Sequence, residues 1–480
     1  MLNYRPLLFI LGIFLSTLTG FMLIPGAFAL YYGEETVAAF MISSLVAGTA
    51  ASFCMHQGQS TKLHLNIRDM FLLTCLTWVI VSLFAAMPFT LYHGINYTDA
   101  FFETMSGITT TGSTVLSGLD TMDHSILIWR SLLQWMGGIG FIVMAVAVLP
   151  FLNVGGMRLF RTESSDWSDK TTPRTQSMAK NLFIVYCLLT FLCFLAYHNS
   201  GMSWFQAINH AMTTLSTGGY STSDQSMAAF SNEAHWVGTT FMLAGGLPLL
   251  MFVYMVQHRS IKIWNDAQVK GFLKFVIFVS CTLALWLWSS REIAALDALR
   301  LASFNVVSVV TTTGYGLTDY TAWGALANIA FLFLMFVGSC SGSTSGGIKI
   351  FRFQIAGVVM REQLKQQFHP NGVFKERYNN RIIKDDIVRS LVTFILLFVM
   401  VIVLLSIVLV LTGLDPVTSF TGAITAVTNV GPGLGGTIGP AGNFSTLPDV
   451  AKWALAIGML LGRLEILTVA VLFHPSFWKY

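Results

Sequence analysis

The sequence has little charge for its length. Asp, Glu, Lys and Arg make up 10% of the 480 residues, whereas 54% of the residues are hydrophobic. Soluble domains carry about 25% charged residues, so this composition excludes an ordinary soluble protein. Ten apolar segments are long enough to cross a membrane as helices. They span residues 7–31, 36–54, 70–93, 125–152, 179–198, 235–257, 271–290, 322–357, 388–412 and 449–474. We therefore predict an all-α polytopic membrane protein, whose first segment is a transmembrane helix and not a removed signal peptide.

Motifs typical of enzymes and cofactor sites are absent as well. The six cysteines are scattered and none forms a CxxC pair, so neither a disulfide framework nor a metal site is expected. HExxH, a Ser/His/Asp set and facing carboxylates do not occur among the apolar segments. The stretch Gly338–Gly347 approaches the phosphate-binding pattern GxxxxGK, but Ile348 separates Gly347 from Lys349 and no strand precedes it. We therefore expect no enzyme, no nucleotide site in this chain and no nucleic-acid partner.

Charged residues are distributed unevenly between the two sides of the predicted membrane. An even number of spans places both termini on the same side. If that side is the cytoplasm, most of the 27 Lys and Arg residues fall inside, as the positive-inside rule requires. More than half of the 23 acidic residues then fall outside. This bias is compatible with ordinary solvated loops and also with an outer surface that concentrates cations.

A weak internal repeat occurs four times along the chain. Each copy has an apolar span, a short amphipathic stretch, a glycine-rich turn and a second apolar span. The stretches and turns are Asp99–Thr114, Ser203–Tyr220, Asp297–Gly316 and Asp415–Gly433, with key glycines Gly112, Gly218, Gly314 and Gly431. The stretches of about 10–14 residues before these glycines are too short to cross a membrane, so we predict re-entrant half-helices. Their expected N-caps are Asp99, Ser203, Asp297 and Asp415.

The turns explain why glycine and threonine stand between apolar spans. An irregular backbone is tolerated at membrane depth only where it is buried in protein or lines a water-filled path. Glycine permits dihedral angles that aim successive carbonyls to one side, and rings of such oxygens replace the hydration shell of an alkali cation. Thr312–Gly316 reads TTGYG, which closely parallels the TVGYG filter of potassium channels. The four turns therefore predict a cation site at the negative ends of four helix dipoles.

Segment 322–357 is too long for a single crossing. Four glycines are expected to break its helix: Gly338, Gly342, Gly346 and Gly347. The break is either a simple kink or a movable plug.

Arg463 lies well within the last predicted span. A charge at that depth is costly and usually faces a pore or a partner. Glu465 is only two residues away, so the two side chains do not face each other on a helix. Arg463 either raises a barrier to cations in a pore wall or pairs with another acid to brace helices.

The turn sequences resemble those of one family. TTTGST, STGGY, TTTGYG and NVGPG occur in this order, after two extra N-terminal spans. With the broken span and the arginine, they resemble the potassium-uptake membrane subunits of the Trk/Ktr/HKT superfamily, most closely the Trk type, over nearly the whole chain. The resemblance implies two N-terminal helices and four helix–half-helix–helix repeats around one central pore. The implied units are residues 1–68, 69–176, 177–264, 265–384 and 385–480.

The resemblance also implies functional residues. Potassium, the transported ion, would be bound in a selectivity filter by Thr110, Thr111, Gly112, Ser216, Thr217, Gly218, Gly219, Thr312, Thr313, Gly314, Tyr315, Asn429, Val430 and Gly431. Gating would involve Gly338, Gly342, Gly346, Gly347, Lys349 and Arg463. Glycine at all four key positions resembles potassium-selective members. The fourth turn departs from the pattern, because Asn429 replaces a threonine and Pro432 has no backbone N–H.

Partners and location follow from the same resemblance. Family members are homodimers in the bacterial inner membrane, in contact with lipid, and both termini are expected in the cytoplasm. The expected partner is a cytosolic ring of Rossmann-type regulatory subunits that bind nucleotides, and the basic inner segments 151–180 and 349–389 offer it a docking face. One alternative is a secondary transporter that couples a solute to sodium or protons, which requires an inverted repeat and ionisable residues in the spans. Another is a membrane enzyme, which requires a catalytic constellation.

Overall fold

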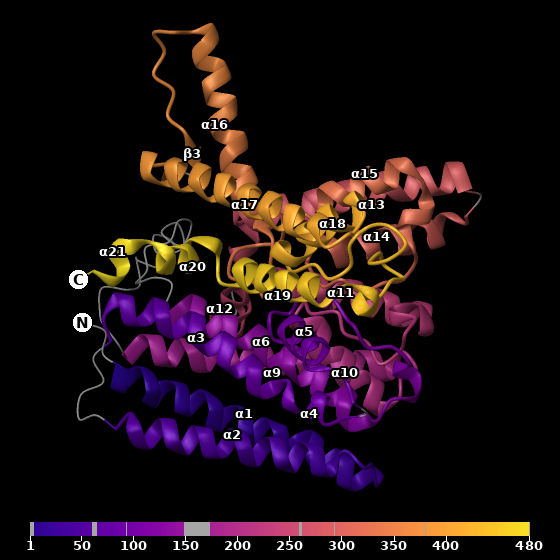
Figure 1. Cartoon of the computed structure of the whole chain (residues 1–480). Helices are drawn as coiled ribbons and strands as arrows, with labels where there is room; N and C mark the ends of the chain where they lie inside the picture. Colours follow the sequence, from indigo (N-terminus) through magenta and orange to yellow (C-terminus); the bar gives the residue numbers. More distant parts are fainter. Residues whose placement is uncertain are drawn as a thin grey trace.

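The computed structural model of the chain describes residues 4–59, 65–92, 94–147, 173–258, 262–291, 293–379 and 381–479, most of which are helical. Two long helices, α1 (Tyr4–Tyr32) and α2 (Val37–Gln57), pack against each other along one edge of the molecule (Figure 1). Among the described residues, six helices are long and apolar enough to cross a membrane, or eight if each of two bent pairs is one span. The prediction of an all-α polytopic membrane protein is confirmed.

Four groups of elements follow α2. The first has α3 (Ile67–Ala85), α4 (Met87–Thr90), α5 (Tyr97–Ile108), η1 (Leu119–Thr121) and α6 (His124–Ala147). The second has α9 (Pro173–Asn199), α10 (Trp204–Leu215), η3 (Ser226–Ala229), α11 (Asn232–Gly246) and α12 (Leu249–His258). The third has η4 (Lys262–Asn265), α13 (Ala267–Arg291), α14 (Ala295–Val310), η5 (Tyr320–Trp323), α15 (Ala325–Leu334), β1 (Val337–Gly338), β2 (Ile348–Lys349) and α16 (Ile350–Phe368). The fourth has β3 (Arg377–Tyr378), β4 (Arg381–Ile382), α17 (Asp385–Leu411), α18 (Pro416–Thr428), η6 (Phe444–Thr446), α19 (Asp449–Arg463), α20 (Ile466–Phe473) and α21 (Pro475–Trp478).

The short helices α5, α10, α14 and α18 are the predicted half-helices. They have 12, 12, 16 and 13 residues, so α14 is longer than expected. Ser203 and Asp415 are N-caps as predicted, but the predictions for the other two helices were wrong. Those helices begin earlier, after the N-cap residues Asn96 and Ala294. Asp99 and Asp297 therefore lie in the first helical turn, where a carboxylate still favours the helix dipole.

Two spans that the sequence predicts as continuous are bent. The axes of α11 and α12 differ by 90°, because Pro248 follows Gly246 and cannot continue the helix. The axes of α19 and α20 differ by 110°, and Glu465 between them has a left-handed φ of 59°. The predicted continuous helices 235–257 and 449–474 were therefore wrong. Arg463 ends α19 and does not lie in the middle of a helix.

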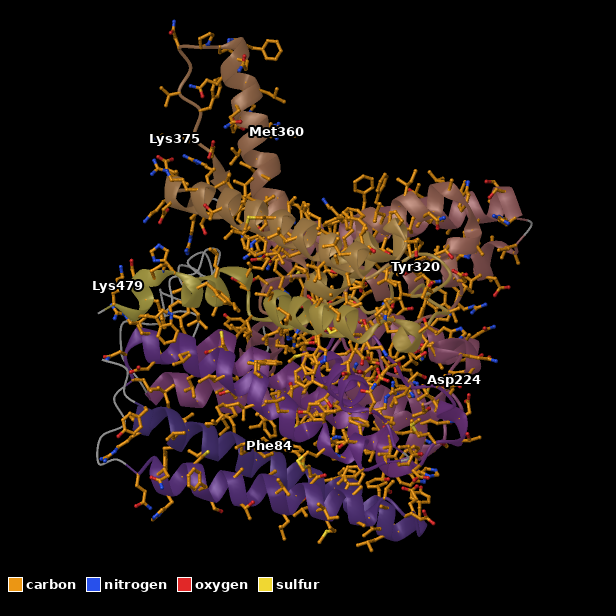
Figure 2. The ribbon with its side chains drawn as sticks, viewed as in Figure 1. Phe84, Asp224, Tyr320, Met360, Lys375 and Lys479 are labelled. Carbon is orange, nitrogen blue, oxygen red and sulfur yellow. The ribbon has the colours of Figure 1, made fainter. Side chains whose placement is uncertain are left out.

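The third inner span is broken as predicted. Helix α15 ends at Leu334 and α16 begins at Ile350, and the chain between them forms the short parallel pair β1–β2. Helix α16 projects away from the rest of the molecule, and the chain returns through the antiparallel pair β3–β4 to α17 (Figure 1). Met360 and Lys375 lie on this arm (Figure 2).

The two chain ends lie at the same end of the molecule (Figure 1). Lys479 is at this end, and Asp224 lies at the opposite end (Figure 2). The long helices run between these two ends, and the half-helices are buried among them. In α5, for example, every residue from Ala100 to Ile108 is buried. The turns that follow the half-helices are thus enclosed by protein.

Candidate functional site

The four turns after the half-helices share one backbone conformation. Each begins with a left-handed residue that is not glycine, which is uncommon in proteins. These residues are Thr110, Thr217, Thr312 and Asn429, with φ of 55°, 53°, 55° and 56°. Two positions later each turn has a glycine with positive φ: Gly112, Gly219, Gly314 and Gly431, with φ of 88°, 78°, 78° and 106°. The same unusual geometry at four places marks these turns as equivalent.

The sequence analysis placed the key glycine of the second turn one residue too early, at Gly218. The structure makes Gly219, and not Gly218, equivalent to Gly112. Hydrogen bonds agree, because the residue before each key glycine donates its N–H to the carbonyl five residues earlier. The pairs are Thr111–Ser106, Gly218–Thr213, Thr313–Ser308 and Val430–Thr425. The sequence STGGY has two adjacent glycines, and its letters alone do not say which one takes the positive φ.

The turns meet in a closed ring. A Cβ atom on Gly112 would lie 2.3 Å from the carbonyl oxygen of Gly218 in the second turn. The same contact recurs between Gly219 and Thr313 (1.9 Å), Gly314 and Val430 (2.1 Å), and Gly431 and Thr111 (2.7 Å). Each turn therefore abuts the next, and the fourth abuts the first. Only glycine combines this close approach with a positive φ.

Side chains tie the turns to their neighbours. Ser113 donates its hydroxyl to the carbonyl of Gly431 at 2.8 Å, and Asn429 Nδ2 donates to Thr111 Oγ1 at 2.9 Å. These two bonds join the first and fourth turns. The Tyr315 hydroxyl lies 2.6 Å from Thr213 Oγ1, which joins the third turn to α10. All of these side chains are at most 1% exposed.

The sequence analysis missed an ion pair between α5 and α6 that supports the first turn. Glu103 and Arg130 are almost completely buried, and Arg130 Nε lies 2.8 Å from Glu103 Oε1. Glu103 also accepts the backbone N–H of Val115 at 2.9 Å, and Arg130 donates to the carbonyl of Ser221 at 3.0 Å. A buried pair is tolerated when its remaining groups are hydrogen-bonded, as here. The available signal was a glutamate in the middle of a half-helix that the sequence predicts to be enclosed by protein.

The chain between α15 and α16, residues 335–349, which we call the inner loop, packs directly against the turns. Gly346 donates its N–H to Thr312 Oγ1 at 2.7 Å, and the Thr344 hydroxyl lies 3.1 Å from the carbonyl of Leu215, at the end of α10. A Cβ atom on Gly346 would lie 2.4 Å from the carbonyl oxygen of Thr428. The four predicted break glycines all belong to this loop: Gly338, Gly342, Gly346 and Gly347.

Arg463 contacts the inner loop. Its guanidinium donates to the carbonyl of Thr344 at 2.7 Å and to the carbonyl of Gly137 in α6 at 3.3 Å. The side chain is 1% exposed. Glu465 pairs instead with Arg352 of α16, at 3.2 Å. The expectation that Arg463 and Glu465 do not face each other thus agrees with their separate partners.

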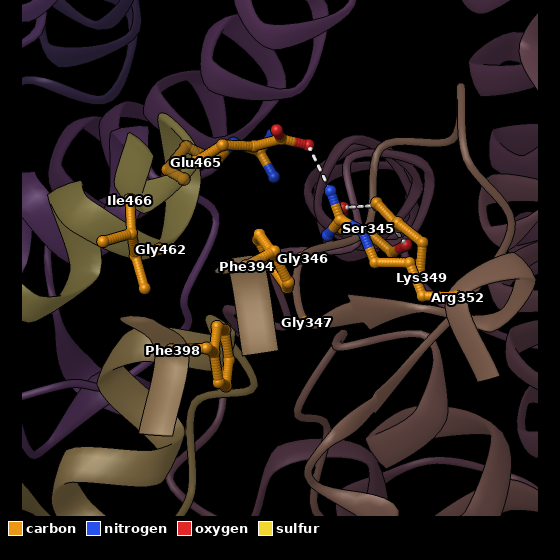
Figure 3. Close-up of a pocket in the computed structure, with 11 residues that line it drawn as sticks. Ser345, Gly346, Gly347, Lys349, Arg352, Phe394, Phe398, Gly462, Glu465 and Ile466 are labelled. Atoms are coloured by element: carbon orange, nitrogen blue, oxygen red, sulfur yellow. Dashed lines mark hydrogen bonds and ion pairs between the residues drawn. The ribbon is translucent and has the colours of Figure 1, made fainter. Parts of the chain in front are cut away.

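A small cavity lies beside the inner loop (Figure 3). Basic groups are concentrated in its wall, which also includes Phe394 and Phe398 of α17. Lys349 donates its ammonium group to the carbonyl and the hydroxyl of Ser345, and Arg352 reaches Glu465 across the cavity (Figure 3). Arg463 completes the wall. Four of the predicted gating residues, Gly346, Gly347, Lys349 and Arg463, therefore line this cavity, and Arg352 is an additional member.

A family model described as TrkH, cation transport protein, matches residues 33–480. The chain belongs to this family. Because the TrkH family consists of cation transport proteins, the chain is a transport protein and not an enzyme. The predicted resemblance to Trk-type proteins is confirmed.

Relatives of this family match over nearly their whole lengths. The chain is 47% identical to the Trk system potassium uptake protein TrkI of Halomonas elongata, over 99% of the chain and 97% of the relative. It is 36% identical to the Trk system potassium uptake protein TrkH of Escherichia coli K12, over the full length of both. The crystal structure of the potassium transporter TrkH from Vibrio parahaemolyticus superimposes with a TM-score of 0.92 at 32% identity, covering 99% of this chain and 100% of that one.

The structure brings the predicted site residues of this TrkH-family chain together in two adjoining regions. The predicted filter residues form the ring of turns, and the predicted gating residues form the inner loop and its contact with α19. The basic residues expected between 151 and 172 lie outside the described part of the chain. His210, in α10, is hydrogen-bonded to the carbonyl of Gln206 and the hydroxyl of Ser221.

Proposed function

We propose that this chain takes up potassium across the bacterial inner membrane through a central pore that passes through the ring of turns. The observation that supports this best is the closed cycle of contacts between each key glycine and a carbonyl of the next turn. Rings of backbone carbonyls can replace the hydration shell of potassium. The C-terminal ends of four half-helices add partial negative charge. The relatives named as potassium uptake proteins support the choice of ion.

The residues that would bind potassium are those of the four turns. Their backbone oxygens supply the ligands in this proposal, and the threonine hydroxyls support the turns from behind. The proposed filter consists of Thr110, Thr111, Gly112, Ser216, Thr217, Gly218, Gly219, Thr312, Thr313, Gly314, Tyr315, Asn429, Val430 and Gly431.

The inner loop and Arg463 would form the gate. The loop packs against the second, third and fourth turns, and Arg463 holds it through the carbonyl of Thr344. A buried positive charge beside the pathway also opposes the passage of cations. Opening then requires the loop to leave this position, and the glycines in the loop permit the necessary change of backbone. The proposed gating residues are Gly338, Gly342, Gly346, Gly347, Lys349 and Arg463.

Control by a cytosolic nucleotide-binding subunit would act through the projecting arm. Helix α16 is continuous in sequence with the inner loop, so a force on the arm reaches the proposed gate directly. The arm is basic and its far end is exposed, including Phe368 and Val373. In this proposal both termini and the arm face the cytoplasm, and the protein acts as a homodimer in the lipid bilayer.

Rubidium uptake into liposomes that contain the purified protein tests the function. We expect uptake that potassium inhibits at much lower concentration than sodium does, and none into protein-free liposomes. A silent protein would be tested again with a cytosolic nucleotide-binding subunit added. Equal inhibition by both ions would contradict a potassium-selective ring. Transport of an organic solute without any alkali-cation flux would contradict the pore.

A further inference from the structure

The second turn differs from the others at one position. Between its left-handed residue and its key glycine it carries Gly218, where the other turns carry Thr111, Thr313 and Val430. Gly218 has no positive φ, so its backbone conformation is open to any residue. Its dihedral angles therefore do not explain why it is glycine. Space does, because a Cβ atom on Gly218 would lie 2.3 Å from the side-chain Cδ of Gln134.

Gln134 reaches the second turn from α6. Its Nε2 donates to the carbonyl oxygen of Gly218 at 2.6 Å, and its Oε1 accepts the backbone N–H of Tyr220 at 3.0 Å. These two bonds fix the orientation of the amide. If the amide were reversed, its oxygen would face the carbonyl oxygen of Gly218 and its NH₂ group would face the N–H of Tyr220. Gln134 thus forms hydrogen bonds with the backbone of the residues before and after Gly219.

The position of Gln134 is apolar in the two equivalent helices of this chain. In three inner helices a glycine approaches the carbonyl that lies two residues before the left-handed residue of the preceding turn. The pairs are Gly137 with Ile108, Gly245 with Leu215, and Gly462 with Val427, at Cβ–oxygen distances of 1.8, 3.2 and 2.0 Å. Three residues before these glycines stand Gln134, Met242 and Met459, all of them 0% exposed. A buried amide destabilises a protein unless it is hydrogen-bonded, so the two bonds to the second turn account for this exception.

The oxygen that Gln134 holds belongs to the ring. The Gly218 carbonyl is the one that abuts Gly112. Within the described residues, no side chain hydrogen-bonds to the equivalent carbonyls of Thr111, Thr313 or Val430. A carbonyl oxygen has two lone pairs, so one remains available to an ion. The bond to Gln134 restrains this oxygen from moving toward a smaller ion.

We propose that Gln134 is a positioning residue that fixes the Gly218 carbonyl and thereby sets the preference for potassium over sodium. The inference rests on the proposed function, in which the ring binds the transported ion. Sodium is smaller than potassium and needs ligands that close in further. If the Gly218 carbonyl is free to move, its oxygen can approach a sodium ion more closely than it can when Gln134 holds it in place.

The test compares variants of the purified full chain by rubidium uptake into liposomes. The measured quantity is the sodium concentration that halves uptake, divided by the potassium concentration that does so. Q134M keeps the packing found at the two equivalent positions and removes both hydrogen bonds. G218A keeps the glutamine in the sequence, but its new methyl group displaces the Gln134 amide from the second turn. Q134A and the double variant Q134A/G218A complete a double-mutant cycle. S131A is the matched control, because Ser131 is buried in α6 but bonds only to Leu127 of its own helix.

We expect Q134M and G218A to lower the ratio about fivefold to tenfold, the equivalent of about one buried hydrogen bond. S131A should retain the wild-type ratio, and the double variant should be no less selective than Q134A. A wild-type ratio in Q134M, or independent additive effects in the cycle, would overturn the inference. If one variant elutes as an aggregate in size-exclusion chromatography, the other single variant decides. A wild-type protein that does not discriminate between the ions overturns the proposed function instead.

Discussion

The ring of turns and the inner loop are neighbours, and both are buried, but they are held in different ways. The ring is held by backbone contacts so close that only glycine fits, such as that between Gly314 and the carbonyl of Val430. The inner loop makes one such contact, between Gly346 and the carbonyl of Thr428, but it is also held by polar side chains of other segments. Thr344 alone receives the guanidinium of Arg463 at its carbonyl and contacts α10 through its hydroxyl.

This difference matches the two roles proposed for the regions. A region that distinguishes ions by size has to keep its shape, and contacts between backbones of four segments resist deformation in every direction. A gate has to move, and contacts made by one side chain can be lost without disturbing the rest of the core.

The largest effect is expected in the ring. Gly314→Ala places a methyl group 2.1 Å from the carbonyl oxygen of Val430, on a residue with φ of 78°. We expect rubidium uptake by purified protein to fall at least about tenfold, since a left-handed alanine alone is unfavourable by about 1–3 kcal/mol. Gly20→Ala in α1 is the control, because nothing lies within 4 Å of its Cβ position. Wild-type uptake in both variants would show that the ring deforms as easily as the loop.

Sequence patterns predicted the ring better than its surroundings. The half-helices and turns were visible because composition changes abruptly there, from apolar spans to glycine and threonine. The bend at Glu465 was not visible, because nothing in the local sequence favours a left-handed glutamate. Its pairing with Arg352 is a contact between segments 113 residues apart. The ion pair between Glu103 and Arg130 depends likewise on packing that brings α5 against α6, so the sequence did not predict which charge each would meet.

The next effect is expected in the inner loop. Arg463→Ala removes the hydrogen bonds to Thr344 and Gly137 and leaves the ring intact. Basal rubidium uptake should rise about tenfold, which corresponds to the lower end of the energy of a hydrogen bond from a charged group. Arg463→Lys distinguishes the two explanations of this residue. If the positive charge of Arg463 is the barrier to cations, the lysine variant takes up rubidium as the wild type does. If the two hydrogen bonds of the guanidinium hold the loop closed, uptake rises in the lysine variant as well as in the alanine variant. Unchanged uptake in Arg463→Ala would remove this arginine from the gate.

The smallest effect is expected from the ion pair that joins the two broken helices. Glu465→Gln weakens the contact of 3.2 Å with Arg352 and keeps the size of the side chain. Because the glutamine oxygen can still accept a hydrogen bond from Arg352 and only the charge is lost, basal rubidium uptake should rise only about twofold. Glu362→Gln is the matched control, since Glu362 pairs with Lys365 within α16 at 2.6 Å and joins no separate elements. A rise in Glu465→Gln alone means that the inner loop is restrained through the bend between α19 and α20 as well as through Arg463. Equal uptake in the two variants would show that this ion pair does not restrain the inner loop.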